Sequence, residues 1–103
     1  MEIINSLSLI GKYSWDAIDI AQIEGATVRL HWADQPYKWH KNDGCEVFVV
    51  LDGKIRMHYL SNNEEHQKIL NPGDICYIKE GEEHVAYPLE PSRILVIEKK
   101  GSI

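Results

Sequence analysis

Turn-forming residues recur along this chain at intervals of about eight to ten residues. Intervals of this length suit short strands and are typical of an all-β sandwich or barrel. They leave little room for helices, so we expect an all-β domain whose closure protects its sheet edges. The turn positions are Gly25, Pro36, Asp43-Gly44, Asp52-Gly53, Asn62-Asn63, Asn71-Pro72-Gly73, Gly81, Pro88 and Pro91.

Alternation of apolar and polar residues supports strands between these turns. In residues 26–33, Val28, Leu30 and Trp32 alternate with Thr27, Arg29 and His31, and residues 54–60 alternate in the same way. Residues 46–51 are almost continuously apolar, which predicts a strand buried on both faces. The core is expected to contain Phe48, Val50, Ile55, Met57 and Tyr59.

Local signals differ in strength along the chain. Asp52-Gly53 predicts a tight hairpin, because glycine readily adopts the positive φ of such a turn. Asn71-Pro72-Gly73 predicts a second turn. The segment after Ser14 fits a helix or a strand equally well, and the sequence leaves that choice open.

Composition excludes several functional classes. Eleven basic and sixteen acidic residues give a net charge of −5, which disfavours nucleic acid and anionic membrane surfaces as partners. The longest apolar run, residues 47–51, is far shorter than the roughly 20 residues of a membrane span. No secretory signal is visible and Cys45 and Cys76 form no zinc-ribbon pair, so we expect a cytoplasmic protein with reduced thiols.

Three residues carry the chemistry that we expect of this chain. His40, Glu46 and His84 offer two imidazoles and a carboxylate, a set that non-haem iron, zinc or manganese accepts. A straight strand would place His40 and Glu46 about 20 Å apart. Asn42-Asp43-Gly44 is a turn-forming sequence, and the bend that it predicts would let both residues reach one ion.

Two motifs resemble those of the cupin superfamily. In the first, His40 is followed by Asn42, by Glu46 after three more residues, and by Gly53 after six. In the second, Gly73, Gly81 and His84 are in register with the family pattern. The resemblance covers residues 27–98 and implies a double-stranded β-helix, the jelly-roll barrel of a small cupin. Residues 1–103 are then one domain, with 1–25 as an N-terminal extension.

The chain departs from the family pattern at three positions. Asn42 replaces the second histidine of the first motif, while Lys79 and Pro88 replace the proline and the asparagine of the second. An amide oxygen is a weaker transition-metal ligand than an imidazole. The resemblance therefore implies a metal site of His40, Glu46 and His84, with Asn42 as a fourth contact and a lowered metal affinity.

The resemblance implies a protein that binds a divalent metal and a small polar metabolite, as a dioxygenase or an isomerase. Iron, manganese, zinc and nickel are not distinguished. The alternative is a metal-free, non-catalytic barrel that binds or senses a small ligand, in which the same residues form a hydrogen-bonded cluster. A homodimer is compatible with both, with an N-terminal strand supplied by Ile3, Ile4, Leu7 and Leu9.

The remaining candidates favour ordinary structural roles. We expect His31, His58 and His66 at the surface, although an inward-facing strand would make Arg29 and His31 an anion-binding pair. Cys45 is expected to be a packed thiol on the face opposite Glu46. Glu80, Glu82 and Glu83 are expected to face solvent, and Tyr37, Trp39, Tyr77 and Tyr87 to pack in the core or an interface rather than against a ligand.

Overall fold

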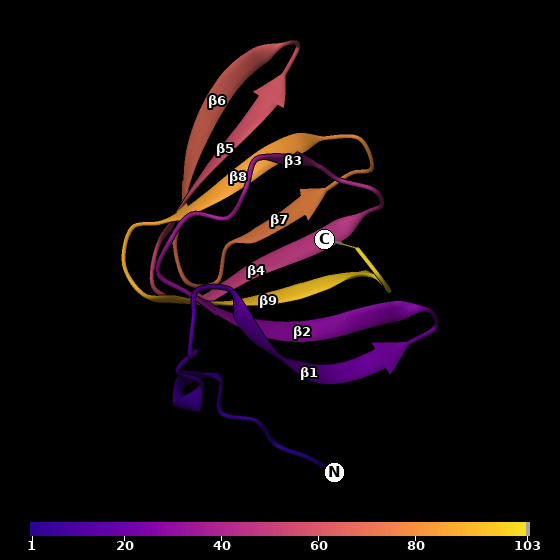
Figure 1. Cartoon of the computed structure of the whole chain (residues 1–103), viewed down its shortest axis with the longest axis vertical. Helices are drawn as coiled ribbons and strands as arrows, with labels where there is room; N and C mark the ends of the chain where they lie inside the picture. Colours follow the sequence, from indigo (N-terminus) through magenta and orange to yellow (C-terminus); the bar gives the residue numbers. More distant parts are fainter. Residues whose placement is uncertain (103) are drawn as a thin grey trace.

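The computed structural model describes residues 1–102 as two antiparallel sheets that face each other (Figure 1). One sheet has the strand order β1-β2-β9-β4-β7 and the other β3-β8-β5-β6, which confirms the all-β jelly roll. Within these residues the only helix is a short 3-10 turn, η1 (Ser6–Ser8), and no helix is long and apolar enough to cross a membrane. The strands are β1 (Asp16–Ile23), β2 (Ala26–Ala33), β3 (His40–Lys41), β4 (Glu46–Asp52), β5 (Ile55–Ser61), β6 (Glu64–Leu70), β7 (Ile75–Ile78), β8 (Glu83–Pro88) and β9 (Ser92–Lys99).

The predicted hairpin at Asp52-Gly53 is wrong. Gly53 does adopt a positive φ of 88°, but β4 pairs with β7 and β9 whereas β5 pairs with β6 and β8. The turn therefore carries the chain from one sheet to the other. An added Cβ at Gly53 would overlap Ser92, so this corner needs glycine for space as well as for its backbone angle.

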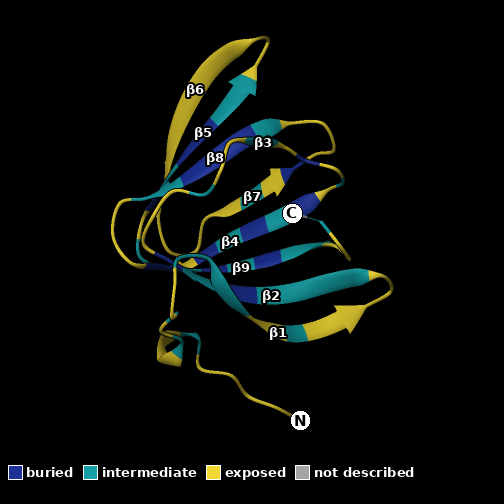
Figure 2. Cartoon of the chain, viewed as in Figure 1, coloured by how far each residue is buried: buried dark blue, intermediate teal, exposed yellow. Residues whose placement is uncertain are grey.

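The core lies between the inner faces of the two sheets, where Figure 2 shows buried residues along β4, β9, β5 and β8. Phe48, Val50, Ile55 and Met57 are buried as predicted, and Tyr59 packs against them half-buried. The segment after Ser14, for which helix and strand were both open, forms β1 and pairs with β2. Burial of these apolar side chains is the main stabilising contribution to the fold.

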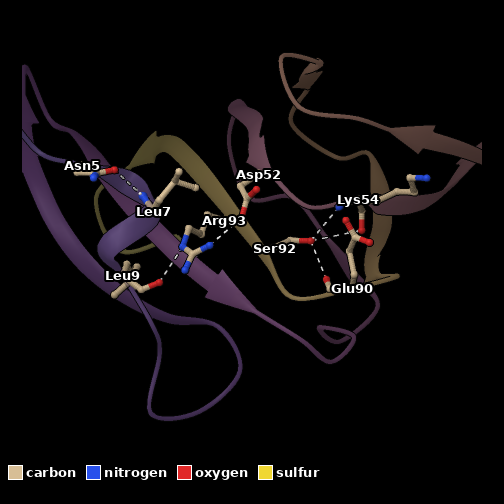
Figure 3. A network of polar contacts seen from close by, with 8 residues as sticks. All are labelled: Asn5, Leu7, Leu9, Asp52, Lys54, Glu90, Ser92 and Arg93. Atoms are coloured by element: carbon tan, nitrogen blue, oxygen red, sulfur yellow. Dashed lines mark hydrogen bonds and ion pairs between the residues drawn. The ribbon is translucent and has the colours of Figure 1, made fainter.

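The N-terminal arm, residues 1–10, extends away from the barrel (Figure 1). It is attached at Leu9, whose carbonyl oxygen accepts a 2.8 Å hydrogen bond from Nε of Arg93. The Nη1 atom of Arg93 donates to Asp52 at 2.7 Å, so one guanidinium joins the arm, β9 and the end of β4 (Figure 3). The apolar side chains of the arm, Met1, Ile3, Ile4, Leu7 and Ile10, remain exposed.

Candidate metal centre

Pairing of two strands places His40 beside His84. β3 pairs with β8 so that His40 lies opposite His84 and Lys41 opposite Glu83. The two imidazole rings are 4.4 Å apart between centroids. Residues that are 44 positions apart in the sequence therefore meet as cross-strand neighbours.

Glu46 reaches the two histidines because the chain bends between β3 and β4, at the turn sequence that predicted such a bend. The backbone N–H of Asn42 donates to Glu82 at 2.9 Å, and Gly81 donates back to the carbonyl oxygen of Asn42 at 2.8 Å. These bonds attach the bend to the loop that precedes His84. One ligand atom from each of His40, Glu46 and His84 lies within 4.8 Å of the others, and Nε2 of His84 is 4.0 Å from Oε1 of Glu46.

The nitrogen atoms of both histidines suit a metal site. Nδ1 of His40 lies 2.9 Å from the carbonyl oxygen of Lys38. A carbonyl only accepts, so Nδ1 carries the proton and Nε2 keeps a free lone pair. A carbonyl partner of this kind also orients metal-binding histidines in general. In His84, Nε2 is the nitrogen that lies 4.0 Å from Oε1 of Glu46, while Nδ1 is buried without a hydrogen-bond partner.

Burial controls the protonation of His84 and Glu46. It lowers the pKa of His84 to about 4, with the neighbouring His40 acting in the same direction, so His84 is neutral near pH 7. Burial raises the pKa of Glu46, against the hydrogen bond from Asn42. Neutral imidazoles are the form that binds metals. The residues present therefore fit a divalent ion.

Asn42, the expected fourth contact, is buried beside this cluster. Its Nδ2 atom donates to the carbonyl oxygen of Gly44 and to Oε1 of Glu46, both at 3.2 Å. The Gly44 carbonyl is an obligate acceptor, which identifies the nearby amide atom as nitrogen. In this structure Asn42 therefore orients the carboxylate of Glu46.

A pocket of about 170 Å³ opens next to the three clustered residues and extends to β2 and β9. Trp15 and Glu98 line it, although the sequence pattern did not mark either as a site residue. Ile94, Val96 and Glu98 alternate on the inner face of β9, so extending the apolar alternation by one step would have found Glu98. Burial, followed by the charge of Glu46, raises the pKa of Glu98 to about 7. The pocket is lined by Trp15, Arg29, His31, Tyr37, His40, Glu46, Phe48, His84, Ala86, Val96, Glu98 and Ser102.

The expected surface position of His31 is wrong. The polar face of β2 faces the inside of the barrel, so His31 and Arg29 line the pocket. Nδ1 of His31 lies 3.1 Å from the carbonyl oxygen of Trp15, and burial lowers the pKa of His31. The apolar face of β2 is turned outward, where Gly11 packs against Trp32. Alternation separated the two faces of this strand correctly but did not show which one faces inward.

The expected surface position of His58 is also wrong, because His58 is only 9% exposed. Its ring lies 4.4 Å from that of Tyr87, and Arg56 donates to its Nε2 atom at 3.0 Å. These large neighbours cover the outer face of β5, which alternation alone identified as polar. His66 is exposed as predicted, and so are Glu80 and Glu82, whereas Glu83 is half-buried.

Cys45 is not the packed thiol that was expected. Its side chain is exposed, and the hydroxyl group of Tyr77 donates to its Sγ atom at 3.4 Å. The position immediately before β4 lies outside the sheet, so the strand alternation does not bury it. Of the four aromatic residues weighed as ligand contacts, Tyr37 lines the pocket, Tyr87 packs on His58, and Trp39 and Tyr77 are exposed.

The family model for the cupin domain matches residues 26–98. No curated protein matches the sequence.

Solved structures share the fold over nearly the whole chain. A cupin-2 domain protein from Shewanella frigidimarina is 25% identical, with a TM-score of 0.79 over 95% of each chain. Protein NMB1881 from Neisseria meningitidis is 19% identical, with a TM-score of 0.77 over 96% of this chain and 100% of the other. Hydroquinone 1,2-dioxygenase from Sphingomonas sp. TTNP3, with 4-hydroxybenzoate bound, is 20% identical, with a TM-score of 0.76 over 86% of this chain and 28% of the enzyme.

Proposed function

The chain belongs to the cupin domain family, and from this premise we propose that it binds a divalent transition metal at His40, Glu46 and His84 and acts there on a small polar molecule. The observation that carries this proposal is the convergence of the three side chains within 4.8 Å from three separate strands. The lowered pKa of buried His84 supports it, because a neutral imidazole is the form that binds a metal.

Two imidazoles and one carboxylate suit iron, manganese, zinc or nickel, and leave coordination positions open for water or substrate. When bound, such an ion supplies Lewis-acid chemistry or activates water or oxygen. Other residues of the chain orient the metal ligands and form the pocket wall. Asn42 orients Glu46, the Lys38 carbonyl fixes the tautomer of His40, and the apolar side chains of Phe48 and Val96 line the pocket beside the metal ligands.

The reaction classes that we propose are dioxygenation and isomerisation of a small metabolite. The pocket beside the site supports a small-molecule substrate, since its volume of about 170 Å³ admits only a compact one. Similarity to a hydroquinone dioxygenase fold is consistent with the first class, although one fold supports many reactions.

A metal-free barrel that binds or senses a small ligand is the second candidate. One observation favours it: Asn42 already donates to Glu46, so part of the polar cluster is satisfied without an ion. In this alternative His40, Glu46 and His84 form a buried polar wall of the ligand pocket.

Elemental analysis of protein purified without chelators separates these two candidates. We expect close to one metal ion per chain, and loss of that ion in Glu46→Gln, which keeps the size of the side chain but removes its charge. Glu64→Gln is the matched control, because Glu64 is exposed on β6. Wild-type protein that holds no metal after incubation with iron, manganese, zinc and nickel would overturn the metal proposal.

We also propose a homodimer in which the arm of one copy packs on the outer face of the five-stranded sheet of the other. Residues 3–10 contain no charged side chain, and the sheet face exposes Ile18, Ile75 and Tyr77. With roughly 100 Å² of apolar area for each large side chain, arm and sheet offer on the order of 800 Å² per partner, as much as a stable interface buries. We propose separately that the protein works in a reducing compartment such as the cytoplasm. Cys45 and Cys76 are both free thiols, which supports this location.

A further inference from the structure

A row of side chains crosses the inner face of the five-stranded sheet. Arg29 on β2 pairs with Val96 on β9, and Val96 pairs with Phe48 on β4. The next row begins at Thr27 and continues through Glu98 to Glu46. Arg29 therefore stands two strands away from the strand that supplies Glu46. At about 4.8 Å between neighbouring strands, this is a backbone separation of roughly 10 Å.

Arg29 is the only arginine or lysine that lines this pocket within residues 1–102. Its Nε atom donates to Asp19 at 2.8 Å, which fixes the direction of the guanidinium, and its Nη atoms make no hydrogen bond with another described residue. Free, oriented guanidinium N–H groups match the geometry of a carboxylate. Arg29 thus supplies a carboxylate-binding group at the end of the pocket remote from Glu46.

The middle of the pocket is apolar, and the end opposite Arg29 is acidic. Phe48 and Val96 form an apolar floor between Arg29 and the three clustered residues. Glu46 lies at the other end, with Glu98 beside it on the intervening strand β9, and these carboxyl groups repel a second carboxylate and accept a hydrogen bond from a hydroxyl group. The volume of about 170 Å³ is close to that of a cavity that holds one benzene molecule, about 150 Å³.

We propose that the pocket binds a small hydroxycarboxylate lengthwise, with its carboxylate on Arg29 and its hydroxyl group at His40, Glu46 and His84. The inference rests on the proposed function in placing the hydroxyl group at the metal site. It deepens that function by naming the class of substrate. Arg29 is then a specificity-determining residue, and His31, beside it on β2, completes the wall at the carboxylate end.

The test titrates 4-hydroxybutyrate into protein prepared with and without Mn²⁺ and follows backbone amide shifts by NMR, using protein with Zn²⁺ where paramagnetic broadening hides the site. The metal content of each sample is measured separately. Butyrate lacks the hydroxyl group, 1,4-butanediol lacks the carboxylate, and succinate carries a second carboxylate. Arg29→Gln removes the proposed contact. Arg56→Gln makes the same change on the outer face of the other sheet, beside Tyr87.

We expect 4-hydroxybutyrate to shift amides of β2 and β9 and to bind more tightly than the three other probes. We expect Arg29→Gln to weaken its binding roughly tenfold or more, because a charge-assisted hydrogen bond is lost, whereas Arg56→Gln leaves binding unchanged. The metal content of Arg29→Gln should equal that of the wild type.

Two results would overturn the inference: metal-loaded protein that does not bind 4-hydroxybutyrate, or Arg29→Gln that binds it as tightly as the wild type. Binding that depends on Arg29, in a protein that holds no metal even after incubation with it, would support the carboxylate assignment and overturn the metal proposal. The two proposals therefore fail in different ways.

Discussion

The side-chain amide of Asn42 donates a 3.2 Å hydrogen bond to Oε1 of Glu46. The first cupin motif has a histidine at the position of Asn42, so in this chain a metal-binding side chain is replaced by one that orients its neighbour. Asn42 is also attached to Gly81 and Glu82 through its backbone, which gives the amide little freedom to turn away. The metal affinity of the site should therefore depend on Asn42 whether or not its oxygen reaches the ion.

Asn42→Ala should weaken metal binding by about 10- to 100-fold, because Glu46 loses the group that orients it. Asn42→His should strengthen binding, since it adds an imidazole at the family position. Isothermal titration with Mn²⁺ and Zn²⁺ measures both effects. Gln67→Ala is the control, an amide removed from an exposed position on β6. Equal affinities for wild type and Asn42→Ala would show that Asn42 does not support the site.

Glu98 should make the metal-free protein less stable as the pH rises. Its pKa is about 7 in the folded protein against 4.5 for an unperturbed glutamate, so the folded state holds the proton more tightly. The stabilising contribution of protonated Glu98 to the free energy of unfolding is complete below about pH 4.5 and is lost as the pH rises through 7. In Glu98→Gln the side chain does not ionise, so this loss of stability does not occur.

Relative to wild type, the free energy of unfolding of Glu98→Gln should rise by on the order of 1 kcal/mol between pH of about 5 and about 8, a figure reduced for the partial exposure of the side chain. Urea unfolding in the presence of a chelator measures this difference. Glu64→Gln, at an exposed position, should show no such change. Parallel pH profiles for wild type and Glu98→Gln would contradict the raised pKa.

Ile94 is 0% exposed at the centre of the core, on the inner face of β9. Ile94→Ala should lower the free energy of unfolding by about 2–5 kcal/mol, through lost burial and the cavity that remains. Ile69→Ala makes the same change on β6 of the other sheet, at a side chain that is 42% exposed, and should cost less than about 0.5 kcal/mol. Chemical denaturation of both variants checks the contrast, and similar losses would argue against the packing described here.

The arm should control association. Replacing Ile3, Ile4 and Leu7 with serine removes apolar contact area without touching the attachment of Leu9 to Arg93. Sedimentation should show the wild type as a dimer of about twice 11.9 kDa and the triple variant as a monomer. A wild-type chain that sediments as a monomer at all accessible concentrations would refute the dimer.

Much of the fold could be predicted because strand formation depends on local residue patterns. Alternation located the strands around Leu30 and Met57, and turn residues separated them. The same local logic did not show which strands pair. Asp52-Gly53 is a tight turn, but Ser92 and Pro91 pack against Gly53 where the chain passes between sheets. Which strands pair depends on contacts between residues far apart in sequence, and these contacts cannot be predicted from a two-residue turn sequence.

Sequence by itself determined the chemistry of this protein: the identities of His40, Glu46 and His84, the turn that lets the first two approach, and the two-residue period of its strands. Only the tertiary structure decided which face of β2 is inside, and hence that Arg29 and His31 line the pocket rather than the surface. It also decided that His58 is covered. The physical reason is that alternation divides a strand into two faces, whereas the inward face is determined by how the strand packs against the opposing sheet, which lies far from it in sequence.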